Sequence, residues 1–154
     1  MSAQQDAERI SDRELVSSRI IHAPSARVFN HWSNPELFAK WWVPAGAPIT
    51  LSVCEMDVRT GGSYRLSFRA GDQNAEFFGR YLEVMPPARL VWTNEEFGEA
   101  GMTVTTVTFQ EHREGTFVTV HDLYPSKEAL DEAINAGSVG AMPLQLKQLG
   151  DAVA

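Results

Sequence analysis

The chain has 154 residues, of which 44% are apolar and 21% are charged, a composition typical of one globular domain with a single core. Its formal net charge of −7 argues against a nucleic acid as partner, because phosphate binding requires a basic surface. The single cysteine excludes an intrachain disulfide, and no apolar run is long enough to span a bilayer. The polar N-terminus lacks the apolar segment of a signal peptide, so we expect a cytoplasmic protein.

The start of the chain predicts a lead-in followed by one domain. Residues 1–13 are mostly polar and charged, which indicates a flexible segment, and residues 14–154 are expected to form a single domain. A first strand is predicted for residues 15–22 and a short helix for residues 25–32.

A second short helix is predicted to begin at Ser33 or Asn34. Pro35 suits the first turn of a helix, and Glu36 follows Ser33 at the spacing of a capping box. The helical segment leads into two adjacent tryptophans, at positions 41 and 42.

Six more strands are predicted between residues 50 and 122, because apolar and polar residues alternate there. The clearest case is Tyr64, Leu66 and Phe68, which alternate with arginine and serine as in a strand with one buried face. Short turns separate consecutive strands, so an antiparallel meander is expected.

The end of the chain predicts a helical tail that begins after Pro125. Its apolar residues recur at spacings of four, three and four, typical of an amphipathic helix: Met142, Leu146, Leu149 and Val153. Gly137, Gly140 and Pro143 predict a kink or a break in this tail. Only this helix is long enough to cover the sheet, so the sheet should curl around it and leave a cavity between the two.

The polar residues do not assemble a catalytic mechanism. The four histidines have no metal-ligand spacing, so neither a metal site nor a cofactor is predicted, and no catalytic residue is assigned. His121, which precedes Asp122 near the end of the last strand, is the best polar candidate for a cavity residue. The alternative for it is an ordinary surface histidine.

The double tryptophan has two interpretations that the sequence leaves open. Both rings can pack in the core, or Trp42 can line the mouth of a pocket and stack on an apolar ligand. The predicted ligand-binding residues are the inward-facing apolar side chains together with the histidine: Trp42, Tyr64, Leu66, Phe68, Phe77, Tyr81, Trp92, Val107, Phe109, His121, Met142 and Leu146. A completely filled core is the alternative for this set.

Several motifs are similar in order and spacing to those of a known family. They are Arg19-Ile20-Ile21-His22-Ala23-Pro24, Asn34-Pro35-Glu36, Trp41-Trp42-Val43-Pro44, Asp57-Val58-Arg59, Gly61-Gly62-Ser63-Tyr64 and Arg89-Leu90-Val91-Trp92-Thr93. On these residues the chain resembles the START-like (SRPBCC) superfamily, and within it the homologues of the activator of the ninety-kilodalton heat-shock protein ATPase. The resemblance implies an α+β helix-grip fold, like that of the birch-pollen allergen. Such a fold has a curved antiparallel sheet of about seven strands around a long C-terminal helix, with two short helices after the first strand.

The same resemblance implies a binding function. It favours a non-enzymatic protein that binds a small hydrophobic ligand, with a link to the stress response. One alternative is a co-chaperone that activates a heat-shock protein ATPase, and another is an enzyme of the cyclase or dehydratase kind that uses the same cavity. The expected partners are an apolar small molecule, a chaperone or a second copy of the chain in a homodimer, with no nucleic acid and no membrane span.

Overall fold

The computed structural model describes residues 7–95, 101–136 and 141–154. These residues form one antiparallel sheet of eight strands, in the order β1-β2-β8-β7-β6-β5-β4-β3, and four helices. The strands are β1 (Glu8–Arg9), β2 (Glu14–Ile21), β3 (Thr50–Met56), β4 (Ser63–Ala70), β5 (Gln73–Met85), β6 (Arg89–Asn94), β7 (Thr103–His112) and β8 (Gly115–Leu123). The helices are α1 (Ser25–Ser33), α2 (Pro35–Phe38), α3 (Lys127–Asn135) and α4 (Ala141–Val153).

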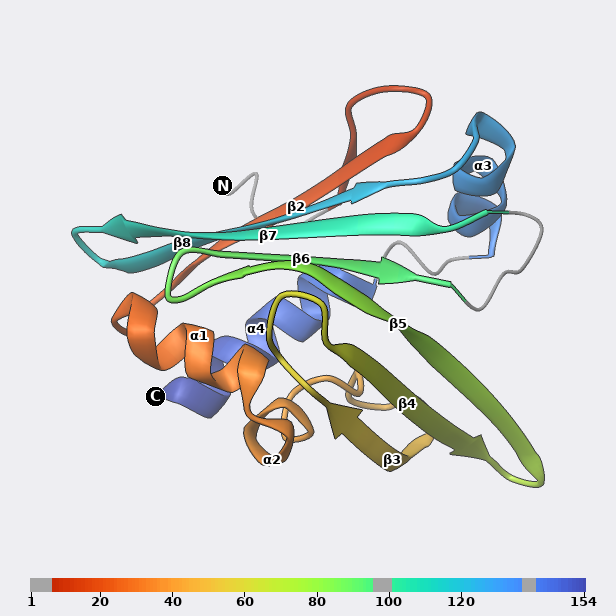
Figure 1. Cartoon of the computed structure of the whole chain (residues 1–154), viewed down its shortest axis with the longest axis horizontal. Coiled ribbons are helices and arrows are strands. Elements are labelled where there is room, and N and C mark those ends of the chain that lie inside the picture. The colour runs from red at the N-terminus through yellow and green to blue at the C-terminus, as the bar shows by residue number, and fades with distance from the viewer. Residues whose placement is uncertain (1–6, 96–100, 137–140) are drawn as a thin grey trace.

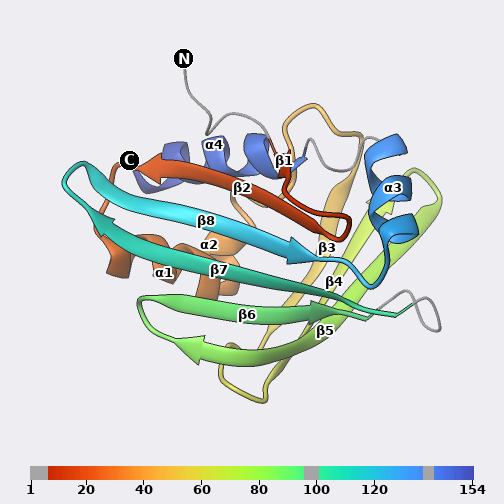
Figure 2. The same cartoon turned by 90° about the horizontal axis from the view of Figure 1, so that it is seen from above.

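The sheet is bent, and the helices lie on its concave side (Figure 1). Strand β5 produces the bend, since its first half pairs with β4 and its second half with β6. Seen from above, β2, β8, β7 and β6 form one layer over the helices, with α3 at the end of the molecule opposite to α1 (Figure 2). The predicted helix-grip architecture is therefore confirmed.

Gly79 makes the close packing at this bend feasible. A Cβ atom at this position would lie 1.9 Å from the carbonyl oxygen of Thr93 on β6. The absence of a side chain lets β5 approach its neighbour closely as it passes from one half of the sheet to the other.

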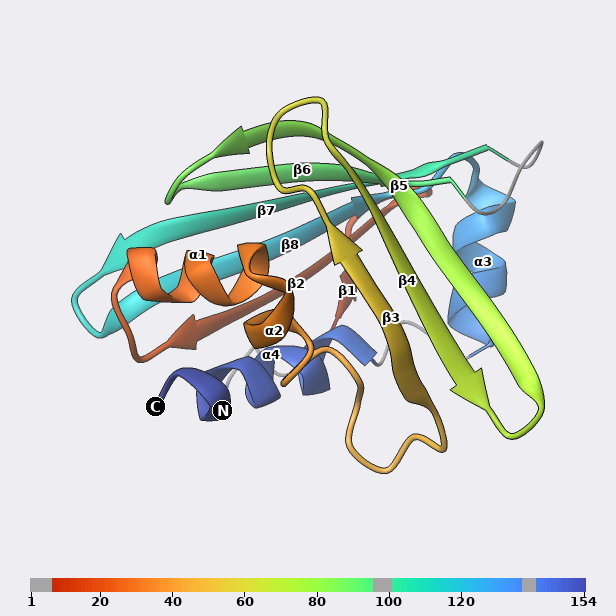
Figure 3. The same ribbon diagram turned by 60° about the horizontal axis from the view of Figure 1, so that its bottom comes forward.

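Two helices pack against one end of the concave face and form the core. Helix α4 contacts β2 and α1, and α1 contacts β7 (Figure 3). Leu146, Leu149 and Val153 face this core from α4 and are at most 2% exposed. The second half of α4 therefore fills the concavity at the α1 end, which leaves only the first half free to border a cavity.

Two details differ from the sequence-based expectations. Glu8–Arg9, within the predicted lead-in, add an eighth strand to the seven predicted. The α2 cap is Asn34, whose side chain accepts a hydrogen bond from the Glu36 amide at 3.0 Å, so the capping box at Ser33 was wrong. The helical tail is two helices, because α3 ends at Asn135. The predicted break at residues 137–140 lies outside the described residues.

A stabilising substitution is expected at Gly150, in the interior of α4. A Cβ atom there would meet only the Cδ1 atom of Ile21, at an ordinary contact distance of 3.8 Å. Alanine also costs less backbone entropy in a helix than glycine does. We expect Gly150→Ala to raise the free energy of unfolding by about 1 kcal/mol, measured by urea denaturation. The control is Ala152→Gly on the same helix, which should lower it, and an unchanged or lower value for Gly150→Ala would contradict the packing described.

Candidate functional site

A cavity of about 810 Å³ lies between the concave face of the sheet and the helices. Strands β3 to β8 supply its wall on one side. The loop after α2, helix α3 and the first half of α4 supply the wall on the other side, through residues such as Trp42, Ala133 and Met142. The volume falls within the range of binding sites for small molecules, which is about 300 to 1,000 Å³.

Aromatic side chains line two parts of the cavity. Trp32, Phe38 and Trp42 line it from the helical side, and Phe68 and Phe77 line it from the sheet. The rings of Phe38 and Trp42 are stacked with centroids 4.6 Å apart, and those of Phe68 and Phe77 meet edge to face at 5.3 Å. Such rings offer large, rigid apolar surfaces to a bound molecule.

The two adjacent tryptophans have different environments. Trp41 is fully buried, and its indole nitrogen donates a hydrogen bond to the His31 carbonyl at 2.9 Å. Trp42 is only partly buried and lines the cavity. Trp32, next to both rings, has a buried indole N–H with no hydrogen-bond acceptor among the described residues.

Two glutamines of α4 hold the tryptophan loop in place. Gln145 donates a hydrogen bond to the Trp42 carbonyl. Gln148 donates to the carbonyls of Trp41 and Val43, at 2.8 and 2.9 Å, and accepts from the amide of Ala45. These bonds satisfy backbone groups that a loop would otherwise leave unpaired, and they fix the position of the Trp42 ring.

The end of the cavity next to α3 has a polar part, as strand register explains. Tyr81, Trp92, Thr105 and Asp122 are aligned in one row across β5, β6, β7 and β8, so all four side chains point to the same face. All four line the cavity. Asn94 and Thr103 form the next row, and Tyr124 follows Asp122 at a spacing of two residues.

Asp122 is the acidic group in this polar part. Its Oδ1 atom accepts a hydrogen bond of 2.6 Å from the Thr105 hydroxyl. The residue is partly buried and lines the cavity. Burial raises the pKa of Asp122 to about 6, against the smaller lowering effects of Thr105 and His121. The group is therefore mostly ionised at neutral pH, but less firmly than an exposed aspartate.

Three tyrosines surround the polar part. The Tyr64 hydroxyl has one proton to donate, and it lies 2.6 Å from the Thr93 carbonyl oxygen and 2.7 Å from Asn94 Oδ1. Burial raises the pKa of Tyr124 to about 12, with a further contribution from the charge of Asp122, and burial also raises the pKa of Tyr81. The phenols of Tyr81 and Tyr124 are therefore neutral hydrogen-bonding groups at neutral pH.

The structure places eight of the twelve predicted ligand-binding residues at the cavity wall. They are Trp42, Tyr64, Leu66, Phe68, Phe77, Tyr81, Trp92 and Met142. Val107, Phe109 and Leu146 lie in the filled core at the α1 end instead, at most 4% exposed. The ring of Phe29 on α1 packs edge to face on Phe109, with centroids 5.3 Å apart, which explains why that part of the sheet borders no open space.

His121 lies on the opposite face of the sheet from the cavity. Consecutive residues of a strand point to opposite sides, and Asp122 occupies the cavity side. The Nε2 atom of His121 lies 2.7 Å from Oε1 of Glu14, and this hydrogen bond lowers the pKa of Glu14. The interaction ties β8 to β2 at the edge of the sheet and has no contact with the cavity.

The polar lining was missed by the sequence analysis. Thr103 and Thr105 share a strand face with Val107, and Asp122 shares one with Val118 and Val120, so alternation alone could have placed them. The sequence could not show that this end of the two strands stays uncovered, because that depends on where α1 and α4 pack.

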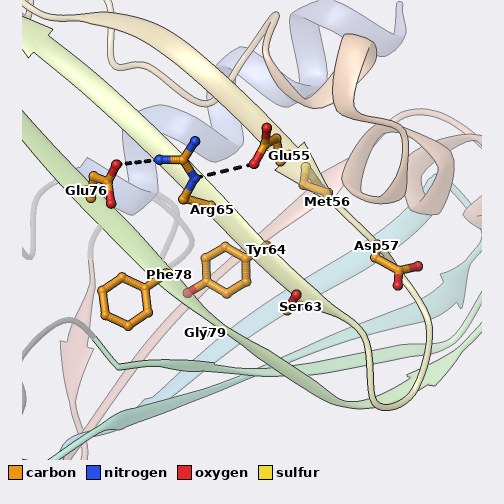
Figure 4. Close-up of a pocket in the computed structure, with 9 residues that line it drawn as sticks. All are labelled: Glu55, Met56, Asp57, Ser63, Tyr64, Arg65, Glu76, Phe78 and Gly79. Carbon is orange, nitrogen blue, oxygen red and sulfur yellow. Dashed lines mark hydrogen bonds and ion pairs between the residues drawn. The ribbon is translucent and has the colours of Figure 1, made fainter.

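A second hollow, of about 640 Å³, lies at the outer surface over β3, β4 and β5 (Figure 4). Its charged groups are already paired: Arg65 bonds Glu76 at 2.5 Å and Glu55 at 3.3 Å. These side chains are substantially exposed, and exposed ion pairs of this kind contribute little. We therefore assign the interior cavity, and not this hollow, as the candidate site.

The bent sheet, the helices in its concavity and the cavity between them define a helix-grip protein of the START-like superfamily. The family model for the Activator of Hsp90 ATPase homolog 1-like protein matches residues 22–154, and the chain belongs to that family. A search among curated proteins gave no match.

Solved structures of bacterial proteins share the fold. A protein from Rhodobacter sphaeroides superimposes with a TM-score of 0.85 at 19% identity, covering 94% of this chain and 95% of its own. One from Nitrosomonas europaea gives 0.82 at 23% identity, covering 94% and 96%. One from Chromobacterium violaceum gives 0.75 at 27% identity, covering 90% and 95%.

Proposed function

We propose that this protein binds a small hydrophobic molecule with a ring system inside the cavity. The observation that carries the proposal is the volume of about 810 Å³ with aromatic side chains along its wall. A filled core would leave no such space, and flat aromatic walls favour a flat or polycyclic ligand over a flexible chain. Membership of a START-like family supports a binding role of this kind.

Filling the cavity is expected to abolish binding. Ala133 lines it from α3, and a tryptophan there would occupy the space. With pyrene as an uncharged polycyclic probe, we expect Ala133→Trp to weaken binding at least about thirtyfold, measured by pyrene fluorescence and calorimetry. Asn135→Trp, on the exposed end of the same helix, is the matched control and should bind as the unmodified chain does.

Native mass spectrometry of the freshly purified protein provides an independent measurement. A retained hydrophobic molecule in the unmodified chain, absent from Ala133→Trp, is expected. If the unmodified chain binds neither pyrene nor any other member of a panel of hydrophobic compounds, the proposal is refuted.

A second candidate function is activation of a heat-shock protein ATPase. Its support is the family itself, whose description names such an activator. The test is the rate of ATP hydrolysis by a purified ninety-kilodalton chaperone with and without the protein. Stimulation that persists in Ala133→Trp would assign this activity to a surface rather than to the cavity, and no stimulation would remove the candidate.

An enzymatic role of the cyclase or dehydratase kind requires a polar group within the cavity. Asp122 and Tyr124 provide such groups, so the cavity wall is not purely apolar. The test is turnover of any retained or bound ligand by the unmodified chain but not by Asp122→Asn. A ligand recovered unchanged after prolonged incubation would argue for binding alone.

A further inference from the structure

The Asp122 carboxylate has an unused hydrogen-bonding capacity. Thr105 donates to Oδ1, and no other hydrogen-bond donor reaches the carboxylate among the described residues. The two oxygens of a carboxylate can together accept about four hydrogen bonds. A buried carboxylate that accepts only a few of them lowers the stability of the folded state. Asp122 lines the cavity, where a ligand can supply the missing donor.

The charge of the lining points to the same kind of group. In the described part of the chain, no lysine, arginine or histidine lines the cavity, whereas two acids do: Asp122 inside and the exposed Glu132 on α3. An anionic head group would meet negative charge without a compensating cation. Fatty acids and phosphate-bearing lipids are therefore disfavoured, and neutral or cationic donors are favoured.

Asn94 adds a second polar group to the cavity lining. Its Oδ1 atom accepts from the Tyr64 hydroxyl, so its amide nitrogen remains a donor. Asn94 lies two strands away from Asp122 and two residues along, so the two backbones are about 12 Å apart. A ligand hydroxyl or amine can therefore donate to Asp122, while Asn94 is placed to bind a separate polar group of the same ligand.

We propose that the ligand carries a hydrogen-bond donor, a hydroxyl or a protonated amine, at one end of its ring system, and that Asp122 binds this donor and determines specificity. The aromatic side chains of the cavity would hold the ring system, and the polar row would orient it. This inference rests on the proposed binding function and narrows it to amphipathic donors of one chemical type.

Five pyrene probes at neutral pH test the inference: pyrene, pyrenemethanol, its methyl ether, pyrenemethylamine and pyrene carboxylate. The alcohol and the amine should bind at least about tenfold more tightly than pyrene, because a hydrogen bond to a buried charge contributes enough for such a factor. The ether, which cannot donate, should show no gain, and the carboxylate should bind more weakly. The alcohol and the amine distinguish a neutral donor from a charged one.

Two isosteric variants assign the effect to one carboxylate. Asp122→Asn keeps an acceptor for Thr105 but removes the charge, so it should abolish the preference for the amine and improve binding of the carboxylate. Glu132→Gln removes the other acid of the lining and should leave both preferences intact.

The outcomes separate the two proposals. If all five probes bind equally, or if Glu132→Gln has the effect predicted for Asp122→Asn, the assignment of Asp122 is wrong while binding in the cavity stands. If pyrene and all its derivatives fail to bind, the binding function itself is wrong. Tighter binding of the carboxylate than of the amine would also overturn the inference.

Discussion

Replacing Trp41 with alanine is expected to lower the free energy of unfolding by about 4 kcal/mol. The ring is fully buried and contacts three aromatic neighbours, with the ring centroid of Trp32 4.7 Å away. The substitution also leaves the buried carbonyl of His31 without its donor, which adds to the cost of the empty space. Urea denaturation followed by far-ultraviolet circular dichroism measures the loss.

The neighbouring Trp42 is the matched control for this prediction. Its ring borders the cavity, so Trp42→Ala removes fewer packing contacts and should cost only about 1 to 2 kcal/mol. The same variant should weaken the binding of pyrene, whereas Trp41→Phe should retain binding and lose part of the stability. Equal losses of stability for Trp41→Ala and Trp42→Ala would contradict the division of roles.

Asp122→Asn is expected to stabilise the protein by about 2 kcal/mol at neutral pH. The pKa of Asp122 is raised from 3.8 to about 6 in the folded chain, so ionising the group opposes folding. This difference between the folded and unfolded pKa corresponds to about 3 kcal/mol in the free energy of unfolding. We expect a smaller effect because Asp122 lines the cavity and is not enclosed by packed protein on every side. The penalty is absent below the unfolded pKa of 3.8 and grows as pH rises to about 6.

The difference in stability between Asp122→Asn and the unmodified chain should therefore vanish below about pH 3 and reach its plateau above about pH 7. Other groups near the carboxyl are the same in both proteins: Thr105 on β7, His121 and Tyr124 beside it, and Glu132 on α3. Comparing the two chains by urea denaturation across this range isolates Asp122. A variant that is less stable than the unmodified chain at neutral pH would contradict the raised pKa.

The opposite effects expected for Asp122→Asn on stability and on specificity are connected. A buried carboxylate that opposes folding is costly to retain, and functional sites commonly carry such costs. The combination of a more stable and less selective variant would be the signature of a residue that serves binding.

Much of the fold was predictable because its signals are local. Alternation identified the strands, and the spacing of Leu146, Leu149 and Val153 identified the buried face of α4. Strand β1 escaped detection because two residues carry no periodic pattern, and it forms through pairing with β2. The start of α2 was predicted at Ser33 or Asn34, and the structure selects Asn34, a usual uncertainty of one position at a helix end.

The site was only partly predictable, for a physical reason. Alternation tells which face a residue occupies, and it correctly placed Phe68 and Trp92 on the concave face. It does not tell whether a helix covers that position. Phe109 and Trp92 both lie on the concave face of the sheet, but α1 packs on Phe109 and leaves Trp92 beside the cavity. The prediction for His121 failed for a different reason. Of the adjacent residues His121 and Asp122, it chose the one that points away from the cavity.

The hydrogen bonds of Gln145 and Gln148 have a mechanical consequence. They join the start of α4 to the backbone at Trp41, Trp42 and Val43, so these two parts of the cavity wall are coupled and move as one body. Helix α3 is held separately, by the ion pair of Asp131 with Arg9 at 2.8 Å and by the fully buried side chain of Leu130. The two walls of the cavity on its helical side are therefore anchored to different parts of the molecule.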